Sequence, residues 1–299
     1  MESSSSRGRV FCGVVDARHR AVVAVVSVIY GADGIEKGNA PGNQPIVFNA
    51  DGTPKASVSV TTLVDWTLDP DDVSGLVVWI DADQDDANYN DGDAVGTITN
   101  WGSGADFVQA TAAKKPTFKT SIINGHDVYR FDGGDCAATS AAVSISTFAV
   151  IAVLRLRGTA GMLYEQSAIT DSNNGSFMYG TAGSSSAVNR SAGTKSGHDH
   201  STNWLAQNVW IVPWSIYRGT HGTHQVGHGL FQQISSTTSF GSADPGESSV
   251  SDTIYLGARN NTSLFITGDV AEFLIYSPAP TSDELRAVIN GLMTKYQIP

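Results

Sequence analysis

The stretch Gly268-Asp-Val-Ala-Glu-Phe-Leu-Ile-Tyr276, with the segment Thr281–Pro299 that follows it, decides the fold of this chain. The first stretch is rich in β-branched and aromatic residues, which favours a strand. Thr281 and Glu284 have the three-residue spacing of a capping box at the start of a helix. Apolar residues then recur on one helical face: Leu285, Val288, Ile289, Leu292 and Tyr296. We therefore predict a final strand followed by one short helix.

The composition of the chain favours strands and turns over helices. The chain has 299 residues, of which 31 are glycine and only 16% are charged, a profile typical of many short strands joined by turns. Turn residues separate about ten to twelve apolar segments from Leu76 to Tyr276, which indicates an all-β sandwich. No repeat of fixed period is visible, so we do not expect a propeller or a solenoid.

The charges are distributed unevenly along the chain. The net charge is −11, and residues 1–68 carry six basic and six acidic side chains, so the whole excess lies in residues 69–299. We expect no nucleic-acid partner, because phosphate binding needs clustered lysine and arginine. Cys12 and Cys136 lie far apart in the sequence, and we expect two free thiols rather than a disulfide.

The sequence divides near Asp69 into a short N-terminal part and a main domain. Residues 1–68 contain two apolar runs, Val10–Val15 and Ala21–Tyr30, and are too small and too interrupted to form a stable core alone. We predict that they form a strand-bearing docking or assembly arm. Ala21–Tyr30 is too short to span a bilayer, and no clear cleavage site for a secretory signal follows it. We expect no membrane span.

Three segments carry a resemblance to a known family. They are Gly75-Leu-Val-Val-Trp-Ile-Asp-Ala-Asp83, Asn124-Gly-His-Asp-Val-Tyr-Arg-Phe-Asp-Gly-Gly-Asp135, and Gly268–Tyr296. They resemble the opening, middle and closing segments of concanavalin A-like (laminin-G-like) jelly-roll domains, of the kind found in phage virion proteins and bacterial surface proteins. The resemblance covers roughly residues 70–299. It implies an all-β jelly-roll sandwich over residues 69–299, with a short C-terminal helix and the N-terminal arm.

The resemblance implies two alternative functions. In the first, the chain is a virion-associated structural protein, such as a phage capsid decoration, fibre or tail-associated protein. Residues 1–68 would then bind other capsid or tail proteins of the virion, the chain would form a homo-oligomer, and the lectin-like domain would face host surface glycan. In the second, the chain is a secreted or cell-surface bacterial carbohydrate-binding module without catalytic activity.

The sequence does not predict an enzyme. It lacks a Gly-x-Ser-x-Gly nucleophile elbow and a convincing Cys–His pair. Its glutamates do not have the spacing that places two carboxylates on one strand in the jelly-roll glucanases.

An acidic segment is the candidate metal site. Nine acidic residues and no basic one lie from Asp69 to Asp93. Alternating carboxylates on a loop suit calcium, a cation that prefers oxygen ligands. The candidate ligands are Asp81, Asp83, Asp85, Asp91 and Asp93. The segment is not an EF-hand, because Asp86 and Gly92 stand where that motif needs glycine and glutamate. The alternative is a solvated acidic loop.

Aromatic and histidine side chains supply the remaining candidates. Trp204, Tyr89 and Trp101 are the candidate carbohydrate-binding residues, and polar surroundings favour Trp204 and Tyr89 among them. Most tryptophans of a sandwich belong to its core. Five of the seven histidines fall within His198–His228. Glycines make a helix there unfavourable, so we expect polar loop and strand residues, with a transition-metal site as the alternative.

Overall fold

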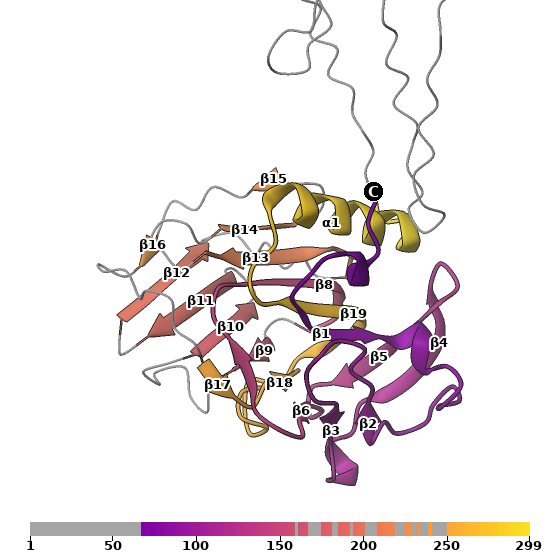
Figure 1. Ribbon diagram of the computed structural model, residues 1–299. Helices are drawn as coiled ribbons and strands as arrows, with labels where there is room; N and C mark the ends of the chain where they lie inside the picture. The colour runs from indigo at the N-terminus through magenta and orange to yellow at the C-terminus, as the bar shows by residue number, and fades with distance from the viewer. Residues whose placement is uncertain are drawn as a thin grey trace, which may run out of the picture. The chain divides into compact units, whose positions relative to one another are not determined.

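The computed structural model describes residues 67–158, 161–166, 175–180, 185–191, 194–200, 208–218, 225–228, 232–233, 239–240 and 250–299. Residues 1–66 of the predicted arm, and Trp204, lie outside these residues. Figure 1 shows that the described chain consists of strands and one α-helix. All strand pairs are antiparallel. The predicted all-β sandwich with a C-terminal helix is confirmed.

One sheet has eight strands in the order β15-β14-β13-β8-β19-β5-β4, and β1 also pairs with β19. The first part of β19 pairs with β5 and the second part with β1, so both strands lie along the same edge of β19. The bounds are β1 (Leu76–Asp81), β4 (Thr117–Ile123), β5 (His126–Asp132), β8 (Phe148–Leu156), β13 (Pro213–Tyr217), β14 (Gln225–His228), β15 (Gln232–Gln233) and β19 (Thr267–Tyr276).

The second sheet has nine strands in the order β16-β12-β11-β10-β9-β18-β6-β3-β2. Its bounds are β2 (Thr97–Ile98), β3 (Phe107–Val108), β6 (Ala137–Thr139), β9 (Gly161–Glu165), β10 (Gly175–Gly180), β11 (Ser185–Ser191), β12 (Thr194–His200), β16 (Ser239–Phe240) and β18 (Tyr255–Leu256). β7 (Val143–Ile145) and β17 (Val250–Asp252) form a separate pair. Three short 3-10 helices complete the description: η1 (Pro70–Asp72), η2 (Ala82–Asp85) and η3 (Ala112–Lys114).

The central strands of the eight-stranded sheet, β8 and β19, are buried on both faces over most of their length. The inner face of this sheet packs on the nine-stranded sheet, and the rings of Phe273 and Tyr164 meet across this interface with centroids 5.8 Å apart. On its outer face, Leu274 and Tyr276 pack under the helix α1 (Ser282–Tyr296). Because both faces are covered, the residues from Phe148 to Leu154 in β8 are all buried and apolar, with no polar alternation.

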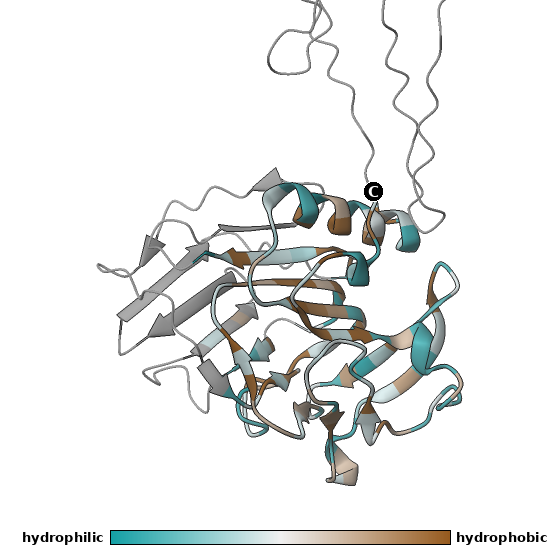
Figure 2. Cartoon of the chain, in the orientation of Figure 1, coloured by the Kyte–Doolittle hydropathy of each residue, from teal (hydrophilic) through white to brown (hydrophobic). Residues whose placement is uncertain are grey.

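The helix α1 begins with the predicted capping box. The Thr281 hydroxyl accepts a hydrogen bond from the Glu284 amide at 3.3 Å, and the Glu284 carboxylate accepts one from the Thr281 amide at 2.8 Å. The predicted apolar face, including Leu285, Val288 and Leu292, is buried against the sheet. Figure 2 shows hydrophobic and hydrophilic residues alternating along α1, as expected for a helix with one covered face.

Two further observations bear on the sequence analysis. Cys136 is a buried free thiol, as predicted, whereas Cys12 lies outside the described residues. Among the described residues, no helix combines the length and the apolar character that a membrane crossing requires.

Candidate functional site

A polar cluster lies where the last turn of α1 meets β1 and β19. Asp81 and Glu272 stand opposite each other in the strand register. The Lys295 ammonium donates to both carboxylates, at 2.8 Å to Asp81 Oδ2 and 3.0 Å to Glu272 Oε2. Trp79 Nε1 donates to Glu272 Oε1 at 2.8 Å, and the Tyr296 hydroxyl donates to Glu272 Oε2 at 2.9 Å. Three donors therefore engage the two oxygens of Glu272.

The surroundings of Glu272 shift its protonation equilibrium. The residue is only 1% exposed. Burial raises the pKa of Glu272 to about 7, and the Asp81 carboxylate adds to this rise, whereas Lys295 opposes it. Burial alone would lower the pKa of Lys295, but the carboxylates of Glu272 and Asp81 raise it above its ordinary value. The lysine therefore stays charged, while Glu272 exchanges its proton near neutral pH.

A second set of contacts joins the cluster to β5. His126 Nδ1 lies 2.6 Å from Asp83 Oδ2, and His126 Nε2 lies 3.0 Å from the Lys295 carbonyl oxygen. Both ring nitrogens of His126 therefore face an oxygen atom, one on η2 and one at the end of α1. The Asp127 amide also donates to Asp83 Oδ1, at 2.8 Å. These bonds fasten the C-terminal end of α1 to the sheet.

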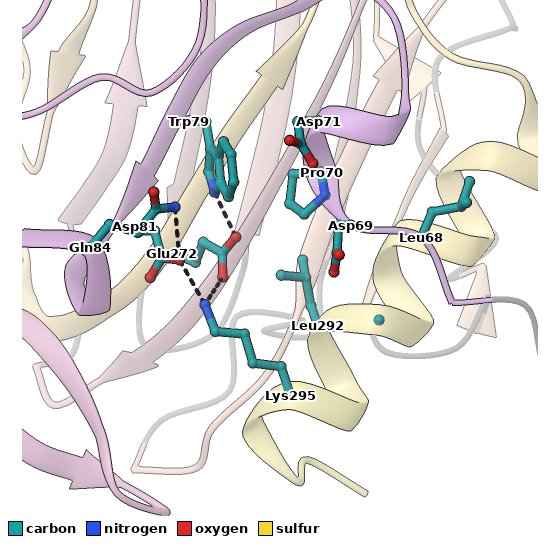
Figure 3. A pocket seen from close by; sticks show the side chains of 11 residues that line it. Leu68, Asp69, Pro70, Asp71, Trp79, Asp81, Gln84, Glu272, Leu292 and Lys295 are labelled. Atoms are coloured by element: carbon teal, nitrogen blue, oxygen red, sulfur yellow. Dashed lines mark hydrogen bonds and ion pairs between the residues drawn. The ribbon is translucent and has the colours of Figure 1, made fainter. Parts of the chain in front are cut away.

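Beside the cluster lies a pocket of about 410 Å³. Figure 3 shows Trp79, Asp81 and Gln84 on one side, Leu68–Asp71 on another, and Glu272 with Lys295 between them. Leu292 and Gly291 of α1 complete the lining. The pocket thus combines an indole with carboxylate, amide and ammonium groups.

The wall formed by Leu68–Asp71 is fixed by backbone contacts. The Leu68 amide donates to the Ala287 carbonyl of α1 at 3.2 Å, and the Tyr276 hydroxyl donates to the Pro70 carbonyl at 2.9 Å. Gly291 allows this close approach, because a Cβ atom there would lie 2.7 Å from the Leu68 carbonyl oxygen. The shape of the pocket is therefore set by the fold itself.

The five candidate calcium ligands contact different protein groups. Asp81 and Asp83 belong to the cluster above. The buried Asp85 accepts from Thr99 and Tyr129, Asp91 pairs with Lys119 at 2.7 Å, and Asp93 accepts from the Asn90 amide at 2.8 Å. Among the described residues, no group of three or more histidine, cysteine, aspartate or glutamate side chains is arranged to hold a metal ion. The calcium site stays a prediction.

The candidate sugar-binding aromatics do not line the pocket. Trp101 is 45% exposed, and its amide donates to the Trp79 carbonyl at 2.8 Å. Tyr89 packs against Phe118 with ring centroids 5.8 Å apart. Trp204 lies outside the described residues. Trp79, Lys295 and Gln84 line the pocket instead, and none of them is among the site residues that the sequence predicts.

A usable signal for this pocket was present in the sequence. Glu272 is a charged residue inside the otherwise apolar run Val270–Tyr276. A buried acid requires donors, so it points to a polar cluster on that face of the strand. The histidines divide between the sheets: His198 and His200 are in β12 of the nine-stranded sheet, whereas His228 is in β14 of the other.

Comparisons with known proteins find remote structural likenesses and no match to the sequence. No protein-family model matches the chain, and no curated protein matches its sequence. The binding domain of botulinum neurotoxin serotype D aligns with a TM-score of 0.48 and 11% identity over 73% of this chain and 51% of that one. A Ruminococcus gnavus IT-sialidase CBM40 bound to alpha2,3 sialyllactose aligns with a TM-score of 0.36 and 12% identity over 48% and 83%.

Trypanosoma rangeli sialidase aligns with a TM-score of 0.42 and 10% identity over 73% of this chain and 33% of that one. The chain therefore spans about half the length of the toxin domain and a third of this sialidase.

Proposed function

We propose that residues 67–299 form a carbohydrate-binding module without catalytic activity, and that the pocket beside Lys295 holds a sugar unit. The observation that carries this proposal is the grouping of Trp79, Asp71, Gln84 and Lys295 around one cavity of about 410 Å³. Small-ligand sites combine apolar or aromatic walls with a few placed polar groups. The indole suits the C–H face of a sugar ring, and the polar groups suit its hydroxyls.

The state of the acids supports binding rather than hydrolysis. Glycoside cleavage needs a carboxyl group within hydrogen-bond reach of the scissile oxygen. Glu272 is buried, and its oxygens already accept from Trp79, Lys295 and Tyr296. Asp81 is 4% exposed and bound to Lys295. Both acids are thus engaged in holding α1 on the sheet.

The module could be attached to a virus particle or to a bacterial surface, or be secreted. Attachment to a virus particle through residues 1–68 is supported by the sequence motifs and by the arm that precedes them. A secreted or cell-surface module of a bacterium has the same motifs in its support. Both settings require that the pocket face outward and bind glycan.

The proposal is tested with the full chain on an immobilised panel of neutral and acidic oligosaccharides. We expect at least one glycan to bind, and the changes Gln84→Ala and Asp71→Ala to weaken it about tenfold, the effect of losing one hydrogen bond to a charged or polar partner. Asp283→Ala is the matched control, because Asp283 lies in the first turn of α1, at the opposite end of the helix from Lys295. Binding that survives both pocket changes, or no binding at all, would overturn the proposal.

A further inference from the structure

Three arginines surround one buried aspartate on the outer face of the eight-stranded sheet. Asp269 in β19 stands opposite Arg130 of β5 and Arg155 of β8 in the strand register. Val128 and Val153, two residues before these arginines in the same strands, belong to the core under α1. Because alternate strand residues share a face, the arginines project on the side that α1 covers elsewhere.

The aspartate fixes the direction of the guanidinium groups. Arg130 binds Asp269 through Nε at 2.6 Å and Nη2 at 3.3 Å. Arg155 binds it through Nη2 at 2.5 Å and Nε at 3.1 Å, and Arg157 Nη1 lies 3.9 Å from it. The Arg155 guanidinium also stacks on the Trp210 ring, 4.8 Å from its centroid. The guanidinium groups are thus held in fixed positions before any ligand binds.

The cluster is also a positive site in an acidic chain. Asp269 is fully buried and brings one negative charge against three guanidinium groups, whereas the whole chain carries −11. The neighbouring acids have partners of their own: Asp91 pairs with Lys119, and Asp132 accepts from the Gly134 amide at 2.8 Å. Three guanidinium groups therefore face the single buried carboxylate of Asp269, which leaves this cluster with a positive charge.

The arginine side chains are accessible. Their exposed fractions are 26% for Arg130, 27% for Arg155 and 43% for Arg157. A guanidinium has five N–H donors in a planar fork that matches a carboxylate. A site that presents several such forks in fixed positions loses little entropy when it binds a two-oxygen anion.

We propose that Arg130, Arg155 and Arg157 bind the carboxylate group of an acidic sugar. This inference rests on the proposed carbohydrate-binding function and names its ligand class as glycan that bears carboxylates. Asp269 and Glu272 are three residues apart on β19, so the cluster lies about 10 Å from the base of the pocket. The two sites can therefore be tested separately.

The test measures binding to the full chain by calorimetry with two matched pairs of sugars. The pairs are trigalacturonate with its neutral methyl ester, and sialyllactose with lactose. We expect at least one acidic member to bind about tenfold more tightly than its neutral counterpart, and this preference to shrink as salt screens the charges. Arg157→Gln should abolish the preference, and Arg157→Lys, which keeps the charge but not the fork, should retain part of it.

Arg218→Gln is the control, because Arg218 is bound to Ser282 at the start of α1. Melting temperatures confirm that each variant is folded. The inference is overturned if neither acidic sugar is preferred, or if Arg157→Gln leaves the preference intact. Neutral sugars that still bind and respond to Gln84→Ala would show that the pocket proposal stands while the cluster fails. A preference for the acidic sugar without any effect of Gln84→Ala would show that the arginine cluster binds the sugar while the pocket proposal fails.

Discussion

At the scale of single residues, Glu272 is the acid that β19 carries into the contact with α1. Its buried carboxylate holds Trp79, Lys295 and Tyr296 together through hydrogen bonds of 2.8–3.0 Å. Removing Glu272 would leave these three buried donors without their acceptor, which is costly in a protein interior. The same residue therefore links the strand, the helix and the pocket.

The charge of Glu272 makes the stability of the domain depend on pH. Its pKa of about 7 lies above the ordinary value of 4.5, so the folded state keeps a proton that the unfolded state has released between these values. The contribution of Glu272 to the free energy of unfolding is therefore full below about pH 4.5 and is lost as the pH rises through about 7. We therefore expect the melting temperature of Glu272→Gln, relative to that of the wild type, to rise as the pH increases from about 4.5 to about 8.

The measurement is a set of thermal melts of both proteins across that range. The difference between the two proteins isolates Glu272, because the other titrating groups are common to both. A difference that stays constant with pH would show that Glu272 titrates near its ordinary pKa.

Calcium binding also belongs to this scale. To coordinate a cation, Asp91 would have to give up Lys119, and Asp85 would have to leave Tyr129 and Thr99. We therefore expect millimolar calcium to raise the melting temperature by no more than about 1 °C over chelator, because a ligand stabilises only as far as it binds the folded state. A larger rise that disappears in Asp91→Ala would establish the site instead.

At the scale of elements, the contribution of the capping box of α1 to stability can be tested by one substitution. Thr281→Ala removes the hydroxyl that accepts from the Glu284 amide. Loss of such a cap costs about 1 kcal/mol, which corresponds to about 2–4 °C in a domain of this size. Thr294→Ala, an exposed threonine in the same helix, should change the melting temperature little. Equal effects of the two changes would contradict a role for the cap.

The sequence predicted those elements whose pattern has a clear physical cause. The helix with its cap, the apolar strand β8 and the strand β9 all stand where hydrophobic runs and turn residues indicate them. The strands β11 and β12 were not predicted, because Ser185–Ser191 and Thr194–His200 are polar and their order comes from pairing with each other and with β10. Local propensity carries no signal for such pairing.

The pocket was harder to predict than the strands for a related reason. Its groups come from β1, β19, α1 and the segment Leu68–Asp71, which meet only in the folded chain. Trp79 and Lys295 are separated by more than two hundred residues, and no spacing rule joins them. The acidic segment was visible in the sequence, but the donors that engage each of its carboxylates were not.

At the scale of the whole molecule, the contacts of Leu68 and Pro70 tie the segment before β1 to the rest of the described chain. Leu68 is bound to Ala287, and Pro70 accepts from the buried Tyr276 hydroxyl. A chain that begins at Thr67 should therefore fold and melt cooperatively. A chain that begins at Asp72 should melt several degrees lower, because the buried hydroxyl loses its acceptor at a cost of about 1–3 kcal/mol. Equal melting temperatures would show that this segment adds nothing to the domain.

Assembly is the property that residues 1–68 are predicted to supply. Residues 69–299 carry twelve basic and twenty-three acidic side chains, so two copies of the domain repel each other, whereas residues 1–68 have no net charge. The apolar runs Val10–Val15 and Ala21–Tyr30 have the composition of strands that add to a partner's sheet edge. Light scattering after size exclusion should give a multimer for the full chain and a monomer for residues 67–299. Because salt screens the repulsion between domains, the multimer should persist or grow as ionic strength rises. A monomeric full chain at every ionic strength would remove the assembly role and favour a module that acts alone.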